Sequence, residues 1–140
     1  MIEDNYQRNA ELLRIIDGDT FVLSIDLGFG IWVRQHVRLS GLDTPEVRGT
    51  ERLAGKFVTG KLAEYIGGRV NCVLSSKEFT TGKFGRCLGE IFFDNLSINQ
   101  WLLEQGLAWE ADAGGKVSDR DVFHLRIPPG IKQQVREAQA

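Results

Sequence analysis

Nine residues, RLSGLDTPE at 38–46, place an arginine, two carboxylates and a Thr-Pro pair at the end of an apolar, strand-like run. Asp, Thr and Pro favour turns for backbone reasons, so an exposed turn is the simplest interpretation. A metal site is the alternative, because hard cations such as Ca²⁺ and Mg²⁺ bind carboxylates together with backbone carbonyls and water. Asp43, the carbonyl of Thr44 and Asp19 from an earlier Asp-Gly-Asp turn would form a three-point site if the fold brings both turns to one rim. Otherwise the two aspartates are unrelated turn residues.

Two arginines and one glutamate could complete such a site. Arg38 lies on the alternating run that leads into Asp43, and Arg86 stands in KFGRCLGE at the start of a later strand-like run. A guanidinium fits two phosphate oxygens, so two of them near a metal could neutralise the charge of a phosphoryl-transfer transition state. Glu46 is placed to take a proton from a metal-activated or adjacent water. Each of these residues alone is compatible with an ordinary surface position.

The surrounding pattern predicts the elements that hold these residues. Apolar runs on both sides of the Asp-Gly-Asp turn, and the alternation in IWVRQHVRL at 31–39, predict three strands joined by short turns. Apolar residues three and four apart predict a helix over 51–66. GGRVNCVL and GRCLGEIFF predict two further strands. Ser97 and Gln100 form the capping box of a second helix, with Gly106 at its C-terminal cap.

This order of elements predicts an α+β, mainly β fold: a five-stranded Greek-key barrel of the OB type with two to three helices. We expect a single domain over 1–140 with its core at 11–109. Residues 110–140 are expected to form a loop and a short helix, opened by Pro128-Pro129 and cut short where the chain ends.

Charge is unevenly distributed along the chain. The net charge is −2, but residues 34–86 hold ten basic and five acidic side chains, while both flanking segments are acidic. A positive middle permits a local anion site, and the acidic remainder weakens long-range attraction to a polyanion.

No targeting or membrane-spanning segment is predicted. The N-terminus lacks an apolar signal region, and no run of about 18 apolar residues occurs. We therefore expect no membrane partner, and a cytoplasmic location unless a leader has been removed. Cys72 and Cys87 are expected to be buried packing residues. Nothing in the sequence requires more than a monomer.

Four motifs in this order, IIDGDTF, VRLSGLDTPE, KFGRCLGEIF and LLEQGLA, closely resemble the staphylococcal nuclease (thermonuclease) family over residues 12 to about 109. The resemblance implies the same OB barrel that the strand order predicts. It also implies Ca²⁺ as cofactor and hydrolysis of phosphodiester bonds in DNA and RNA, with a preference for single strands and 3′-phosphate products.

The resemblance assigns roles to three metal ligands, a base and two arginines: Asp19, Asp43, Thr44, Glu46, Arg38 and Arg86. The first three would hold Ca²⁺, the threonine through its carbonyl. The glutamate would activate the attacking water, and the arginines would bind and stabilise the phosphate.

The chain departs from the family where nucleotide contacts are expected. After QGLA the family's well-studied member has tyrosines, whereas this chain continues WEADAGG. We expect Trp109 or Phe84 to supply an aromatic face for a base, with Lys83 as a further substrate contact. Glu110 and Asp112 would repel phosphates if they face the site.

Three functions therefore remain open. The first is a calcium-dependent nuclease acting on DNA or RNA. The second is a non-catalytic OB-fold module that binds nucleic acid, favoured by the acidic composition and the missing tyrosines. The third is an intact site whose target is not a nucleic acid.

Overall fold

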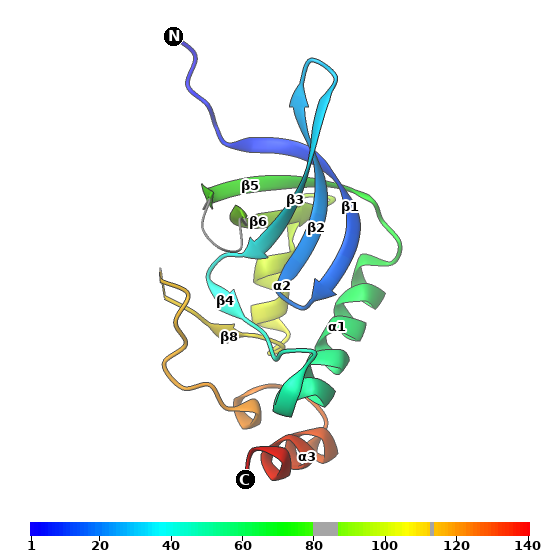
Figure 1. Ribbon diagram of the computed structural model, residues 1–140, viewed down its shortest axis with the longest axis vertical. Helices are drawn as coiled ribbons and strands as arrows, with labels where there is room; N and C mark the ends of the chain where they lie inside the picture. Colours follow the sequence, from blue (N-terminus) through cyan, green and yellow to red (C-terminus); the bar gives the residue numbers. More distant parts are fainter. Residues whose placement is uncertain (80–86, 113) are drawn as a thin grey trace.

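A closed barrel forms the centre of the protein. The computed structural model describes residues 1–79, 87–112 and 114–140. Five longer strands of this part of the chain make up the barrel: β1 (Gln7–Asp17), β2 (Thr20–Gly28), β3 (Ile31–Leu39), β5 (Asn71–Phe79) and β6 (Cys87–Phe93). They pair in the order β3-β2-β1-β5-β6, and β3 also pairs with β6, which closes the sheet (Figure 1). The β3–β6 pairing is parallel, through Val37↔Cys87, and the other four are antiparallel.

The described residues form three α-helices next to the barrel: α1 (Arg52–Ile66), α2 (Ile98–Glu104) and α3 (Pro129–Gln139). Shorter elements join them: β4 (Leu42–Asp43), η1 (Gly49–Glu51), β7 (Leu96–Ser97), β8 (Trp109–Glu110) and η2 (Val122–His124). Helix α3 lies below the barrel against α1 and η1 (Figure 1). The mixed five-stranded barrel with three helices confirms the predicted α+β fold of the OB type.

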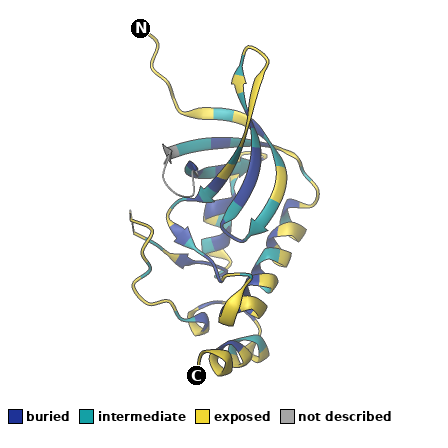
Figure 2. Ribbon diagram, viewed as in Figure 1, coloured by how far each residue is buried: buried dark blue, intermediate teal, exposed yellow. Residues whose placement is uncertain are grey.

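The core lies inside the barrel and under the helices. Strand β6 shows the two-residue period most clearly, with Cys87, Gly89, Ile91 and Phe93 buried and the residues between them half-buried. Figure 2 shows buried residues along the strands and on the inner sides of α1 and α2, whereas the N-terminus and most of α3 are exposed. The fully buried side chains include Phe21, Leu23, Val37, Leu39, Val58, Leu62, Ile91, Phe93 and Leu102. Cys72 and Cys87 are buried free cysteines, as predicted.

Helix ends follow their sequence signals. The Oγ of Ser97 accepts a hydrogen bond from the Gln100 N–H at 3.1 Å, which is the predicted cap of α2. The Gln100 side chain does not complete the capping box but donates to Glu104 one turn later, at 2.9 Å. Gly106 follows α2 with φ +68°, a left-handed conformation that favours glycine. Pro129 opens α3 as expected.

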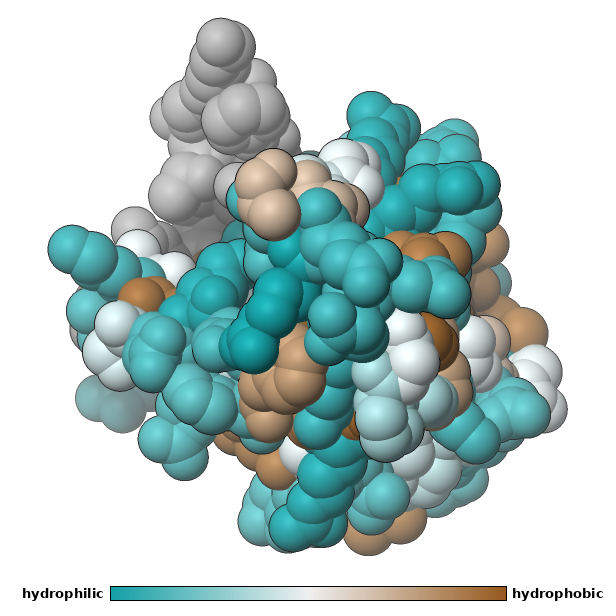
Figure 3. Space-filling view, turned by 90° about the horizontal axis from the view of Figure 1, so that it is seen from below, coloured by the Kyte–Doolittle hydropathy of each residue, from teal (hydrophilic) through white to brown (hydrophobic). Residues whose placement is uncertain are grey.

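Two further features concern the surface. Viewed from the end that carries α3, hydrophilic side chains dominate the face and apolar ones are scattered among them (Figure 3). Among the residues that the structure describes, no helix has the length and apolar character needed to cross a membrane.

The two-residue strands β4 and β8 were not predicted, because such short strands carry no periodic signal. They pair through Leu42↔Glu110 and Asp43↔Trp109.

Candidate active site

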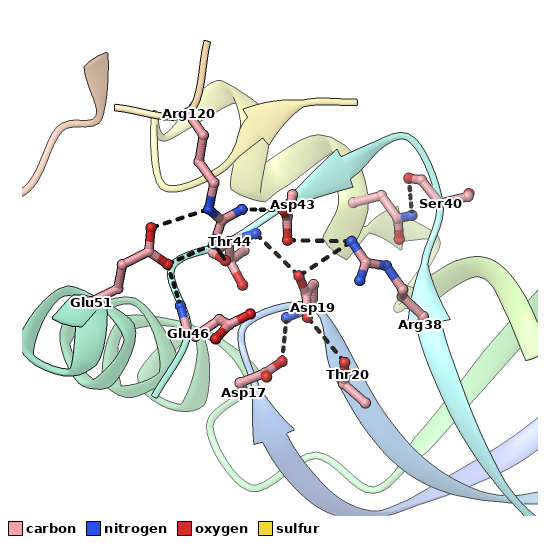
Figure 4. A network of polar contacts seen from close by, with 11 residues as sticks. Asp17, Asp19, Thr20, Arg38, Ser40, Asp43, Thr44, Glu46, Glu51 and Arg120 are labelled. Carbon is pink, nitrogen blue, oxygen red and sulfur yellow. Dashed lines mark hydrogen bonds and ion pairs between the residues drawn. The ribbon is translucent and has the colours of Figure 1, made fainter. Parts of the chain in front are cut away.

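Two turns meet at one end of the barrel and bring the predicted carboxylates together (Figure 4). The turn between β1 and β2 carries Asp19, whose Oδ2 accepts the Thr44 N–H at 3.1 Å and whose carbonyl accepts the Leu39 N–H at 2.8 Å. Gly18 permits this approach. A β-carbon there would lie 2.8 Å from Thr44 Oγ1 and 2.9 Å from Val58 Cγ1, so no other residue fits without a shift.

Arg38 joins the two aspartates. Its Nη2 lies 3.2 Å from Asp43 Oδ1 and 3.8 Å from Asp19 Oδ2. The side chain extends from β3 opposite Thr20 of β2, and 23% of it is exposed. A guanidinium has five N–H donors, so Arg38 can hold the carboxylates and still donate to a phosphate oxygen.

Glu46 has a fixed backbone and an exposed carboxylate. Its N–H donates to Oε1 of Glu51 at 3.0 Å, and its side chain points toward Asp17 and Asp19 (Figure 4). Helix α1 supports the turn at Gly55, where a β-carbon would lie only 2.1 Å from the Glu46 carbonyl oxygen. The mid-helix glycine therefore lets α1 seat directly against the turn that carries Glu46.

Arg120 enters the same site from the segment that follows β8. Its Nη1 donates to Asp43 Oδ2, and its Nη2 donates to the Thr44 carbonyl at 3.1 Å. The same guanidinium forms a bidentate pair with Glu51, at 2.6 Å for Nη2–Oε1 and 3.1 Å for Nε–Oε2. It also lies over the Trp109 ring, 4.4 Å from the ring centre. The sequence analysis assigned no role to Arg120 or Glu51. The signal for Arg120 was a basic residue within an acidic, aperiodic segment.

The carboxylates perturb one another. Burial and the neighbouring Asp19 raise the pKa of Asp17 to about 7. Burial and a hydrogen bond with Asp19 raise the pKa of Asp43 to about 6, although the charges of Arg120 and Arg38 act to lower it. The pKa of Asp19 is lowered: burial acts to raise it, but hydrogen bonds from Asp17 and Asp43 and the charge of Arg38 outweigh burial. Crowded carboxylates that hold protons near neutral pH are a place where a cation is favoured.

The donor set fits a hard divalent cation. Asp19, Asp43 and the Thr44 carbonyl supply the oxygen ligands that Ca²⁺ and Mg²⁺ prefer. The Thr44 hydroxyl is buried at the same turn and has no hydrogen-bond partner among the residues described. Across 1–79, 87–112 and 114–140, no three His, Cys, Asp or Glu side chains are grouped so as to hold an ion by themselves. Backbone, water or substrate oxygens would therefore have to complete the coordination.

A cleft of about 730 Å³ opens beside these residues. Acidic and basic side chains both line it. The acidic ones are Asp17, Asp19, Asp43 and Glu46, and the basic ones are Arg14, His36, Arg38 and Arg48. Phosphate groups are commonly held by such basic side chains, while the acidic cluster gives the cleft a separate position for a cation.

The remaining predicted residues are three substrate contacts and a second arginine. Lys83, Phe84 and Arg86 lie outside the described residues. The structure differs from the prediction at Trp109, which is only 5% exposed. Its Nε1 donates to the Asp121 carbonyl at 2.9 Å and its ring faces Arg120, so it presents no open face to a base. The β4–β8 pairing turns the indole inward.

Fold and site together define a small OB-type barrel domain with a cleft suited to a cation and a phosphate. The chain matches the family of staphylococcal nuclease homologues over residues 36–125, more than half of its length, and it belongs to this family. The matched region includes Arg38, Asp43, Glu46 and Arg120 and begins after Asp19.

Two relatives illustrate the similarity. The chain is 33% identical over 73 residues, 52% of its length, to Staphylococcal-like nuclease CAN1 of Arabidopsis thaliana, of which it covers 21%. It is 28% identical over 116 residues, 82% of its length, to an uncharacterized 38.1 kDa protein of Capnoides sempervirens, of which it covers 32%. The chain thus spans about a fifth to a third of these proteins. Family membership and the first relative support a nuclease-type function.

Proposed function

We propose that this chain is a calcium-dependent nuclease that hydrolyses phosphodiester bonds of single-stranded DNA or RNA and leaves 3′-phosphates. The observation that carries the proposal is the meeting of Asp19, Asp43, Arg38 and Glu46 at one cleft, with the backbone of Thr44 bonded to Asp19 at its edge. These residues come from two distant segments. The arrangement unites hard oxygen ligands, a phosphate-binding cation and an exposed base.

The residues have separate roles in this mechanism. Asp19, Asp43 and the Thr44 carbonyl would hold Ca²⁺, which when bound supplies positive charge to the phosphate and to the attacking water. Arg38 binds the phosphate, and its charge stabilises the transition state. Glu46 accepts the proton of the attacking water, because its carboxylate is exposed on the cleft and its backbone is fixed. The water oxygen bonds to phosphorus while the bond from phosphorus to the 5′-oxygen breaks. The 5′-oxygen takes a proton from solvent and leaves as a hydroxyl, and the phosphate stays on the 3′ side.

Nucleic acid is the proposed substrate, because the cleft carries basic side chains beyond the catalytic arginine. Arg14 and Arg48 line it together with His36. These side chains would contact phosphates next to the scissile one. Arg86 remains proposed as the second catalytic arginine, and Lys83 and Phe84 as substrate contacts, on the strength of the family resemblance.

The test is cleavage of a labelled single-stranded DNA by the purified protein, with Ca²⁺ and with a chelator. Glu46→Gln and Arg38→Ala should each lower chelator-sensitive cleavage by about 100-fold or more, the scale for losing a general base or a charge-stabilising donor. Arg34→Ala is the matched control. Arg34 lies on the same strand but does not line the cleft, so this variant should cleave like the parent.

The alternative outcomes are distinct. Cleavage that both variants retain would identify a contaminating nuclease. Absence of cleavage, combined with oligonucleotide binding that Arg38→Ala weakens, would favour the non-catalytic OB-fold module.

A further inference from the structure

The polar contacts of Arg120 bear on how the site would bind metal. Of the three proposed ligands, two already accept hydrogen bonds from this one guanidinium: Asp43 through Oδ2 and Thr44 through its carbonyl. The other oxygen of Asp43 accepts from Arg38 at 3.2 Å. Asp43 is therefore shared between two permanent positive charges, since an arginine does not lose its proton in proteins.

The position of Arg120 is built into the fold. The main chain beside it is tied to β8, because Trp109 Nε1 donates to the Asp121 carbonyl at 2.9 Å. The Asp121 carboxylate caps η2 through the Phe123 N–H at 3.0 Å. The guanidinium then lies over the buried Trp109 ring, which is next to the turn of Asp43 through the β4–β8 pairing. Such an arrangement is more than a chance surface ion pair.

Glu51 gives Arg120 a second partner that does not depend on the proposed metal ligands. The Glu51 side chain is 11% exposed and pairs with the guanidinium through both oxygens. If a cation took Asp43 and the Thr44 carbonyl, Arg120 would keep this bidentate pair and need not become buried without a partner. About 30% of the Arg120 side chain is exposed, which leaves room for a small displacement.

The proposed metal site, formed by Asp19, Asp43 and the Thr44 carbonyl, is called the seat below. We propose that Arg120 is a built-in counter-cation of this seat, and that it sets the metal affinity by competing with the divalent ion for Asp43 and the Thr44 carbonyl. This inference rests on the proposed function for the identity of the seat. Like charges at neighbouring positions repel, and the repulsion is strong where the groups are partly buried. The resident arginine therefore makes the seat weaker for Ca²⁺ than its oxygen ligands alone would be.

The experiment is calorimetric titration of the full chain with Ca²⁺ alone, at pH 8 and fixed ionic strength, without nucleotide. Arg120→Gln should bind Ca²⁺ at least about tenfold more tightly than the parent, the scale expected for removing one charge beside two ligands at intermediate dielectric. Arg120→Lys keeps the charge and should stay close to the parent. Arg34→Gln changes the net charge equally but away from the seat, and should also stay close to the parent.

The outcomes separate this inference from the proposed function. Unchanged or weaker Ca²⁺ binding in Arg120→Gln, with binding that Asp43→Asn still abolishes, overturns the role of Arg120 and leaves the seat intact. Ca²⁺ binding that Asp43→Asn leaves unchanged overturns the seat itself and with it the inference. If Arg120→Gln does not fold because Glu51 loses its partner, the double variant Arg120→Gln/Glu51→Gln removes both charges. Tighter binding than Glu51→Gln alone then supports the proposal, and equal or weaker binding contradicts it.

Discussion

Gly55 offers the sharpest test of how the fold holds the candidate site. It occupies the interior of α1, where replacing glycine by alanine normally stabilises a helix by about 0.5 to 1 kcal/mol. Here a β-carbon would lie 2.1 Å from the Glu46 carbonyl oxygen and 2.7 Å from the Val47 nitrogen. A carbon–oxygen contact ordinarily needs about 3.3 Å or more, so the turn or the helix must shift by about 1 Å. The obstacle is backbone, which cannot rotate away as a side chain would.

The two effects can be weighed against each other. Overpacking of this kind costs about 1 to 3 kcal/mol, and rigid backbone on both sides places the cost in the upper part of that range. Gly55→Ala should therefore lower the free energy of unfolding by about 1 to 2 kcal/mol despite its better helix propensity. A displacement of about 1 Å at Glu46 should also lower nuclease turnover by about 100-fold.

Urea unfolding followed by circular dichroism measures the first effect, and cleavage of labelled single-stranded DNA measures the second. Gly60→Ala is the matched control in the same helix. Gly60 is exposed and a β-carbon there meets nothing within 4 Å, so this variant should gain about 0.5 to 1 kcal/mol and keep its activity. If both alanine variants gain stability alike, α1 does not pack against the turn of Glu46, which would refute the prediction.

Three further predictions concern stability and reactivity. Without divalent ions, the free energy of unfolding should fall as pH rises from about 4 to about 7. The reason is that folded Asp17, with its pKa raised to about 7, keeps a proton that the unfolded chain releases. Asp17→Asn should flatten this pH dependence in urea titrations, and an unchanged slope would contradict the raised pKa of Asp17. Asn99→Ala should destabilise by about 2 to 3 kcal/mol, because the buried amide bonds two carbonyls and one N–H of neighbouring strands and loops; the exposed Gln100→Ala should change stability by less than about 0.5 kcal/mol. Cys72, whose burial raises its pKa to about 12, and buried Cys87 should react with a thiol reagent far more slowly in the folded protein than in urea, and equal rates would show that the barrel opens readily.

Periodicity explains what the sequence could predict. The alternation of 31–39 and the helical spacing of 51–66 appear in the structure as β3 and α1, because each element buries one face against the same core. The strand order allowed the turns of Asp19 and Asp43 to lie at one end of the barrel, but two unrelated turns remained the alternative until the structure brought them together. Local pattern and turn chemistry were sufficient for the elements and not for the contact between the two turns.

Other features depend on contacts between distant segments, which no local pattern records. Arg120 meets Asp43 across 77 positions and Glu51 across 69. The inward turn of Trp109 depends on a two-residue pairing with β4. Gly55 could be recognised as a weak helix residue, but its purpose appears only once the turn of Glu46 lies against it. The candidate site residues that lie within motifs could therefore be predicted from the sequence. The residues that hold them in place, such as Arg120, Glu51 and Gly55, could not.

The pairing of β3 with β6 has a kinetic consequence. This parallel contact joins Val37 to Cys87. The whole chain segment between these two residues, which includes α1 and β5, must be brought into place before the barrel closes. Such non-local pairings cost chain entropy before they bring stabilisation, so they tend to form late in folding. The turn of Asp43 follows β3 directly, and Arg120 arrives from still further along the chain. Ion binding at this turn would therefore appear only after the barrel has closed, and its rate of appearance would follow the last step of folding.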